Sequence, residues 1–217
     1  MRSRFDEQLA LLNKELISMG ALCENAIAIS VEALMTGELT LVKKVRAIEG
    51  EIDEAERAIE SICMKLILHQ QPVARDLRQI SAALKMITDM ERIGDQAADI
   101  AEIVKLGNIR AGDDVASVDD MAIATIKMVT DSVDAYVNRD LELAKYVIDY
   151  DDVVDDLFNK VKEQLITFIE NKRGSGEYAV DLLMIAKYFE RIGDHAVNIA
   201  EWVLYSITGV HREEMRP

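Results

Sequence analysis

Apolar residues recur along this chain at positions i, i+3, i+4 and i+7, the spacing of helices that bury one face. The 217 residues contain six such stretches, and no stretch shows the sustained alternation of a β-strand. Only two prolines interrupt the chain, so the helices can be long. The pattern predicts helices over residues 5–35, 39–69, 72–106, 118–137, 141–171 and 177–207.

Glycine, proline and serine mark the expected helix ends. Gly37 and Gly209 follow the first and last helices, where glycine commonly ends a helix. Pro72 is expected in the first turn of the third helix, where its missing N–H costs no hydrogen bond. Ser117 is expected to cap the fourth helix, three residues before Asp120. The segment "GNIRAGDDVAS" between the third and fourth helices predicts a linker.

The last three helices repeat the plan of the first three. The letters ERIGD occur at residues 91–95 and again at residues 190–194, which is 99 residues later. A helix of about 30 residues spans about 45 Å, and three such helices make a bundle. The sequence therefore predicts an all-α fold of two tandem three-helix bundles, covering residues 1–108 and 115–217.

The net charge and the cysteine content limit which classes of partner and which cellular compartment we expect. Forty acidic and 25 basic residues give a net charge of −15, which opposes binding to nucleic acid and to anionic lipid. The chain lacks an N-terminal signal-peptide pattern and has no run of 18 apolar residues. Cys23 and Cys63 stand singly, as expected of reduced core thiols. We expect a cytoplasmic protein without direct membrane insertion.

Carboxylates interrupt the apolar stripes of four helices. On a helical wheel, Asp95 lies about 40° from Glu91, and the apolar Ile80 and Ile87 lie within about 40° of Glu91 as well. The middle helix of each half carries acids at the same spacing. Four i, i+4 pairs result: Glu49/Asp53, Glu91/Asp95, Asp151/Asp155 and Glu190/Asp194.

Two interpretations of these acids compete. Partly desolvated carboxylates on facing helices cost free energy unless they are protonated, paired or bound to a cation. Two facing pairs would supply four hard oxygen ligands for iron, manganese, magnesium, calcium or zinc. A single pair, however, is usually a solvated surface feature, and nearby Arg92 or Lys187 could neutralise it. Gly94 and Gly193 suggest close helix approach, with or without a ligand.

Catalytic signatures are missing from the sequence. It has no E-x-x-H pair of the di-iron bundles, no H-E-x-x-H, and no phosphate-binding glycine loop or G-x-S-x-G motif. We therefore expect no enzymatic activity. The alternatives are a metal-dependent enzyme or metal store that uses the carboxylates, or a structural helical module with free acidic faces.

The repeated motif and its surroundings resemble a known family. The segments "QQPVARDLRQISAALKMITDMERIGDQAADIAE" and "AKYFERIGDHAVNIAEWVLYSITG" are similar to the PhoU family, accessory regulators of the bacterial phosphate-specific transport system. The resemblance implies a negative regulator of phosphate uptake and of phosphate-starvation signalling. It also implies contact with the transporter ATPase subunit and with a sensor histidine kinase, and a homodimer.

The same resemblance implies multinuclear metal clusters, with iron or zinc ahead of manganese, magnesium and calcium. Asn198 stands where the first half has Asp99, which predicts a weaker second site. Glu102 and Glu201 are outer candidates. By position, the implied metal ligands are Glu49, Asp53, Glu91, Asp95, Asp99, Asp151, Asp155, Glu190, Asp194 and Asn198.

Overall fold

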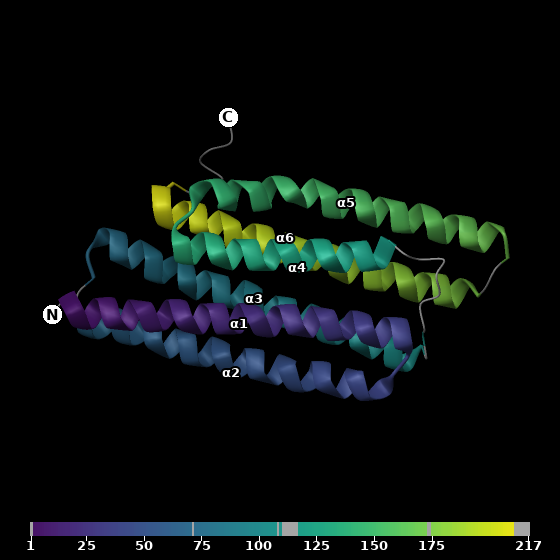
Figure 1. The fold of residues 1–217 in the computed structure, drawn as a ribbon, viewed down its shortest axis with the longest axis horizontal. Coiled ribbons are helices and arrows are strands. Elements are labelled where there is room, and N and C mark those ends of the chain that lie inside the picture. The colour runs from purple at the N-terminus through teal and green to yellow at the C-terminus, as the bar shows by residue number, and fades with distance from the viewer. Residues whose placement is uncertain (1, 71, 108, 110–116, 173–174, 211–217) are drawn as a thin grey trace.

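A computed structural model describes residues 2–70, 72–107, 109, 117–172 and 175–210, and these residues form six helices and no strand (Figure 1). The all-α prediction and the three-plus-three order of helices are confirmed. The predicted linker lies mostly outside the described residues. The helices are α1 (Arg2–Thr36), α2 (Leu39–Gln70), α3 (Ala74–Leu106), α4 (Ser117–Asn138), α5 (Leu141–Glu170) and α6 (Gly176–Thr208).

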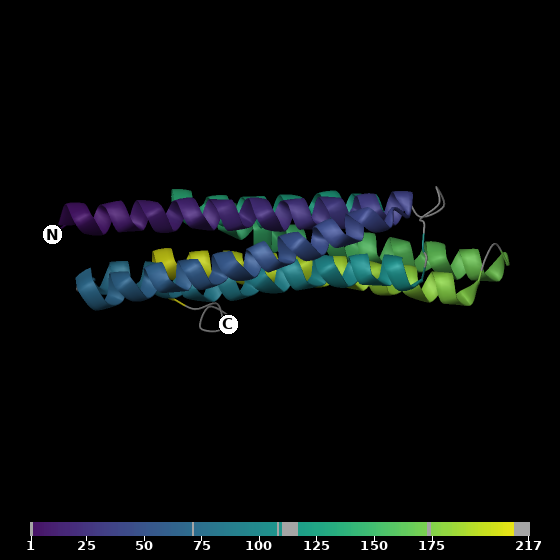
Figure 2. The ribbon, with the colours of Figure 1, turned by 90° about the horizontal axis from the view of Figure 1, so that it is seen from below.

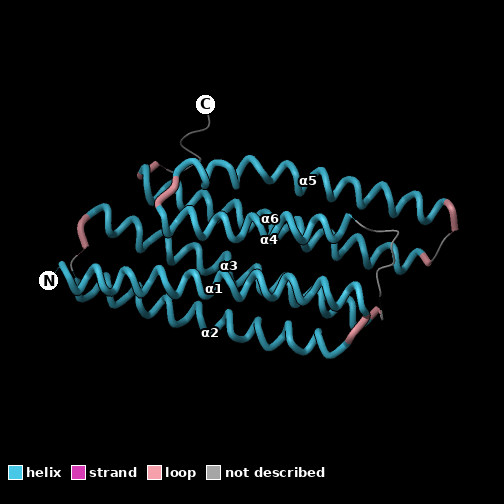
Figure 3. The backbone as a smooth tube through the Cα atoms, in the orientation of Figure 1, coloured by secondary structure: helices cyan, strands magenta, loops and turns pink. Residues whose placement is uncertain are grey.

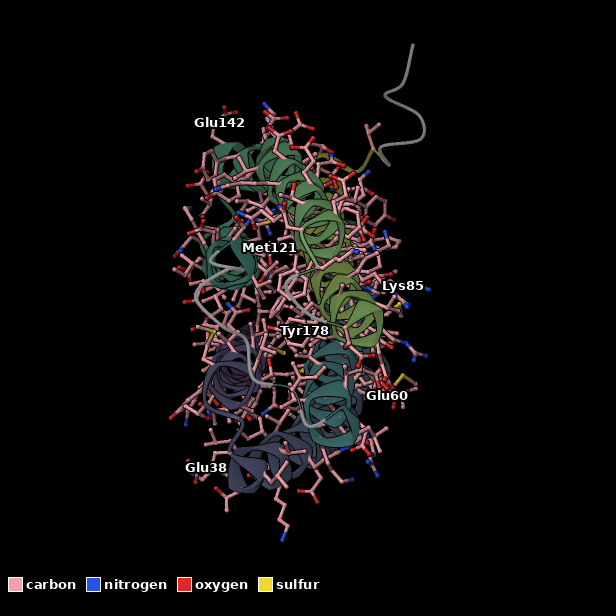
Figure 4. The ribbon with its side chains drawn as sticks, turned by 90° about the vertical axis from the view of Figure 1, so that its right-hand side faces the viewer. Glu38, Glu60, Lys85, Met121, Glu142 and Tyr178 are labelled. Atoms are coloured by element: carbon pink, nitrogen blue, oxygen red, sulfur yellow. The ribbon has the colours of Figure 1, made fainter. Side chains whose placement is uncertain are left out.

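Four helices form the centre of the molecule, and one helix covers each end of that group. α1, α3, α6 and α4 pack in a ring, in which α3 lies along α6 and α1 lies along α4. α2 packs on α1 and α3, and α5 packs on α4 and α6. Viewed along the helices, α2 and α5 therefore lie at opposite edges of the section (Figure 4). Seen from below, α1 and α4 form one layer, and α3 and α6 lie in the other (Figure 2).

The apolar stripes meet in a core that runs through both halves. Ile52 of α2 and Ile93 of α3 are fully buried, as are Val154 of α5 and Ile192 of α6. The helices of the two halves also pack closely against each other. A Cβ atom placed on Gly20 of α1 would lie 3.3 Å from Val133 Cγ2 of α4. Because both halves contribute to the same core, the repeats are two bundles fused along one side.

Two of the expected helix starts are wrong. Pro72 precedes α3, whose N-cap is the extended Val73, so the proline lies outside the first turn. Ser117 is itself the first residue of α4, and its buried hydroxyl has no hydrogen-bond partner. The caps that form are at α5, where Asp140 accepts from two backbone N–H groups, and at α6, where Ser175 accepts from one.

The first helix is long and apolar enough, by length and composition, to be considered as a membrane span. Its stretch from Phe5 to Thr36 has a mean hydropathy of 1.4 in the most apolar window. The core helix of a globular protein passes the same test. Leu12, Leu16 and Met19 of this stretch are fully buried against the other helices, so α1 serves here as a core helix.

The short connections on either side of α2 and α5 appear as pink segments in Figure 3.

Candidate metal centre

The predicted acids lie on α2 and α3 in the first half of the chain and on α5 and α6 in the second half. Figure 4 labels Lys85 of α3 and Glu60 of α2 on one side of the molecule. Beside Glu91 on the helical wheel, Ile80 and Ile87 are buried, whereas Leu84 is half-buried and Leu77 is exposed, so the acids lie at the edge of the core. We call Glu49, Asp53, Glu56, Glu91, Asp95 and Asp99 the first acidic cluster, and Asp151, Asp155, Glu190 and Asp194 the second acidic cluster.

In the first acidic cluster, burial and mutual repulsion act together. Burial raises the pKa of Glu49, and the carboxylates of Asp53, Asp95 and Asp99 raise it further. The pKa of Glu91 is also raised, first by burial and then by Asp95. Since Glu49 belongs to α2 while Asp95 and Asp99 belong to α3, the structure brings the two predicted pairs within electrostatic reach of each other. Six carboxylates of α2 and α3 thus interact electrostatically.

The second acidic cluster shows the same effect more strongly at one residue. Burial raises the pKa of Asp151 to about 6, and Asp155, Asp194 and Glu190 contribute to this shift. Burial also raises the pKa of Asp194, and Glu190 adds to it. The predicted pairs of α5 and α6 therefore face each other. Their mutual repulsion adds to burial in raising the pKa of Asp151 and of Asp194.

Basic side chains compensate part of the charge, as the competing interpretation anticipated. Arg92 lies 3.4 Å from the Glu91 carboxylate and 3.1 Å from Asp95, and Arg57 pairs with Asp53. In the second cluster Lys187 forms an ion pair with Glu190 Oε2, although this buried oxygen has no aligned hydrogen bond. These pairs are at the surface or half-buried, so each contributes little. The pKa values of Glu49, Glu91, Asp151 and Asp194 are nevertheless raised, first by burial and then by neighbouring carboxylates.

The two glycines of the ERIGD motifs serve different contacts. A Cβ atom on Gly94 would lie 2.9 Å from Ile52 Cδ1, so the first glycine lets α2 and α3 pack closely through apolar atoms. A Cβ atom on Gly193 would lie 3.4 Å from Asp151 Oδ1 and 3.5 Å from Val154 Cγ1. The second glycine therefore leaves room beside a carboxylate. Tight packing explains Gly94 without a ligand.

Asp99 and Asn198 lie at the seam between α3 and α6, and each faces the opposite half. The Asn198 amide donates to Asp89 Oδ1 at 3.1 Å, and His195 Nδ1 lies 2.9 Å from the same oxygen. Asp99 interacts with the hydroxyl of Tyr188, whose pKa is raised first by burial and then by this carboxylate. Tyr188 and Asp89 are equivalent positions 99 residues apart, so the two contacts are related by the repeat.

Glu56 is a member of the first cluster that the sequence-based ligand set omits. Burial raises its pKa, followed by repulsion from Asp53 and Glu60, while Thr88 lowers it by hydrogen bonding. The signal was present in the sequence, because Glu56 follows Asp53 by three residues on the same helical face. Its equivalent in the second half is Phe158, which lies under the ammonium of Lys187 at 5.6 Å. The first cluster is therefore richer in carboxylates.

The carboxylate oxygens of the two clusters are the type of ligand that a hard cation prefers. They do not form a closed coordination shell. Within the described ranges, no three His, Cys, Asp or Glu side chains converge closely enough to hold a metal ion as they stand. The oxygen donors, the excess negative charge and the buried Glu190 oxygen are what Mg²⁺, Ca²⁺, Mn²⁺, iron or zinc would use. Glu102 pairs instead with Lys105 at 2.9 Å. Glu201 is half-buried at the equivalent position of α6.

Known proteins resemble this chain in sequence over almost its full length. A phosphate-specific transport system accessory protein PhoU homolog from Clostridium acetobutylicum is 36% identical over 210 residues, covering 96% of each chain. A PhoU homolog from Thermotoga maritima is 33% identical and covers 97% of this chain and 91% of its own.

Solved structures of PhoU proteins have the same fold as this chain. The crystal structure of PhoU from Pseudomonas aeruginosa matches with a TM-score of 0.87 at 31% identity, covering 95% of this chain and all of that one. The regulatory protein PhoU from Streptococcus pneumoniae has the same fold, with a TM-score of 0.85 at 23% identity. The PhoU domain model matches twice, at residues 16–104 and 118–203, once in each three-helix half. With both halves matched and the likeness running from end to end, the chain belongs to the PhoU family.

Proposed function

We propose that this protein is a negative regulator of phosphate uptake and of phosphate-starvation signalling. It would act in the cytoplasm as an adaptor between the ATPase subunit of a phosphate ABC transporter and a sensor histidine kinase. The observation that carries this proposal is the match of both halves to the PhoU domain, together with full-length relatives named as accessory proteins of phosphate-specific transport. A rigid body of six long helices suits a docking role, because its faces keep a fixed relation to each other.

Metal binding at the two acidic clusters is the second part of the proposal. The ligands would be Glu49 and Asp53 with Glu91 and Asp95 in the first cluster, joined by Asp99. A bound cation would relieve the repulsion that raises the pKa of Glu49 and Glu91. In the second cluster the ligands would be Asp151, Asp155, Glu190 and Asp194, with Asn198 at its edge. Iron and zinc are the first metals to test.

The adaptor role is favoured over catalysis. The clusters contain carboxylates without a histidine or thiolate ligand, and the sequence carries no nucleophile–base motif. A metal-dependent enzyme or a metal store would instead hydrolyse phosphoesters or oxidise ferrous iron when loaded with metal. Purified, metal-loaded protein that turned over either substrate would replace the adaptor proposal with that alternative.

A chromosomal deletion tests the regulatory role directly. At high external phosphate we expect the deletion strain to take up phosphate faster and to transcribe starvation genes that the parent keeps off. Restoring the intact gene is the control. Unchanged uptake and transcription in the deletion strain would reject the proposal.

Elemental analysis tests the metal sites, on protein purified without chelators or a metal-affinity tag. We expect bound metal that falls on Asp95→Ala while the helical circular dichroism spectrum is retained. Equal metal content in wild type and in the variant would remove Asp95 from the ligand set. Light scattering of the same samples tests the expected homodimer.

A further inference from the structure

Three arginines gather at one end of this acidic molecule. Arg75 and Arg78 lie in the first turns of α3, and Arg139 lies in the turn between α4 and α5. These segments and the end of α6 lie at the same end of the molecule as the N-terminus (Figure 1). Within the described part of the chain, none of the three arginines forms an ion pair with a carboxylate. Burial lowers the pKa of Arg139, and Arg75 and Arg78 lower it further, while Asp76 acts in the opposite direction.

The turn holds Arg139 against α3 in a strained conformation. Arg139 has φ 55°, a left-handed backbone that is unfavourable for a residue with a side chain. Its Nη1 donates to Gln79 Oε1 at 3.1 Å, and the Tyr136 hydroxyl donates to the carbonyl of Gln79 at 2.9 Å. Two contacts from α4 and its turn thus keep the guanidinium beside the start of α3.

Arg78 contributes a donor that the protein does not use. Its guanidinium lies against Gly209, where an added Cβ atom would be 3.3 Å from Nη1 and 3.5 Å from Nε. Arg78 Nε is buried and has no hydrogen-bond partner in the described structure. Such an unmade hydrogen bond costs free energy, and because Nε itself is closed to solvent, an oxyanion would reach Arg78 through its Nη atoms. The positive charge of Arg78 can stabilise the C-terminus of α6, where free carbonyl groups carry partial negative charge. This interaction leaves Nε without a hydrogen bond.

The start of α3 adds further donors on the same side. Val73 is the N-cap, and its side chain provides no acceptor for the free N–H groups of the first turn. The N-terminus of a helix of 33 residues attracts negative charge through these N–H groups and its dipole. Arg75 lies in this turn and Arg78 directly follows it, so side-chain and backbone donors lie within one helix end.

We propose that Arg75, Arg78 and Arg139 form a binding site for a tetrahedral phosphate oxyanion. Guanidinium groups bind phosphate oxygens with paired, charge-assisted hydrogen bonds, and a dianion would offset the repulsion among three clustered cations. The site lies apart from both acidic clusters and stands on its own geometry. Only its use as a readout of cellular phosphate rests on the proposed regulatory function. The ligand is either free inorganic phosphate or the phosphoryl group of a monoester.

Two variants at one position separate charge from folding. Arg139→Gly removes the cation and also relieves the left-handed strain, so it should leave the fold intact. Arg139→Lys keeps the charge. Lys172 is the matched control, because it has φ 52° in the turn after α5, at the opposite end of the molecule (Figure 1). Lys172→Gly removes one cation and one strained side chain without touching the site.

Calorimetric titration of the full-length protein with inorganic phosphate, in chloride buffer, is the test. We expect saturable binding that weakens as salt rises, at least about tenfold weaker binding in Arg139→Gly, and near wild-type binding in Lys172→Gly. Arg139→Lys should fall between them. Absence of saturable phosphate and monoester binding would overturn the proposal. Equal weakening by Arg139→Gly and Lys172→Gly would also overturn it, because net charge alone would then explain the effect.

A parallel titration with AMP distinguishes the two sources of the oxyanion. Tighter binding of inorganic phosphate assigns the site to the free ion, and tighter binding of AMP assigns it to a phosphate monoester. Either result, if sensitive to Arg139→Gly, supports the site. The deletion experiment reports on regulation without involving Arg139, so failure of the regulatory proposal and failure of this binding site are separate outcomes.

Discussion

Asp151 gives the molecule a carboxyl group that titrates near neutrality. Its pKa is about 6 when folded, against an ordinary value of 3.8, because burial and four nearby carboxylates disfavour its charge. Its contribution to stability is therefore fully present below about pH 3.8 and is lost as the pH rises through about 6. For metal-free protein, we expect Asp151→Asn to increase the free energy of unfolding more at pH 7 than at pH 5. Urea unfolding in chelator measures this. A stabilisation independent of pH would show that Asp151 keeps an ordinary pKa.

Glu56 should distinguish the affinities of the two acidic clusters. The first cluster has Glu56 where the second has Phe158, and it has Asp99 where the second has Asn198. Since affinity for hard cations rises with ligand charge, we expect the first cluster to hold the tighter class of metal ions. Glu56→Gln should weaken this class in a metal titration of the apo-protein. Glu60→Gln makes the same charge change on an exposed position of α2, and should have little effect. Equal effects would exclude Glu56 as a ligand.

Asn198 shows what residue-level reasoning could not predict. Its equivalence to Asp99 was readable from the repeat, but its hydrogen bond to Asp89 depends on how α6 packs on α3. Introducing Asp at position 198 would place two carboxylates together at the seam, so this change should weaken contact between the halves. The ring of His195 also contacts Asp89, from the same helix as Asn198.

At the scale of helices, three internal glycines allow a matched comparison. Gly50 has no atom within 4 Å of an added Cβ, so Gly50→Ala should gain the full helix propensity, about 1 kcal/mol. Gly193→Ala should gain less, because the methyl group would contact Asp151. In Gly94→Ala the gain should be cancelled, because the buried Ile52 must move. Thermal or urea unfolding measures the series. A Gly94→Ala variant as stable as Gly50→Ala would mean that Ile52 adapts freely.

Helix positions were predictable from the sequence to within a few residues, because the apolar spacing extends over about 30 residues in most of these helices. Helix ends were less predictable, since a cap depends on a few side-chain contacts. Asp140 caps α5, and nothing in the apolar pattern distinguishes it from other acids. Ser117 has the right residue type for a cap but is buried instead. The sequence could predict that the acidic pairs of neighbouring helices face each other, because each pair lies on the apolar face of its helix. The ion pairs of Arg92 were only one of several possible ways to neutralise these acids.

At the scale of the whole molecule, the two halves share one packed body. α3 lies along α6 and α1 along α4, so splitting the chain would expose apolar surface of four helices. Specific contacts join the same surfaces: Thr130 donates to Glu24 at 2.8 Å, and Tyr136 donates to the Gln79 carbonyl at 2.9 Å. The repeat in the sequence predicts two bundles, but it does not indicate how much surface each bundle buries against the other.

We therefore expect the full chain to unfold in one cooperative transition. Residues 1–108 expressed alone should be less helical or should aggregate, because the faces of α1 and α3 that pack on the second half would be exposed. Ile52→Ala lies in the first half and Val154→Ala in the second, and both residues are fully buried. Each change should lower the single midpoint seen by calorimetry and by circular dichroism, with Ile52→Ala costing about 2–5 kcal/mol and the smaller Val154 less. If either variant instead produced two separated transitions, the halves would be independent domains, and the packing of α3 on α6 would contribute little to stability.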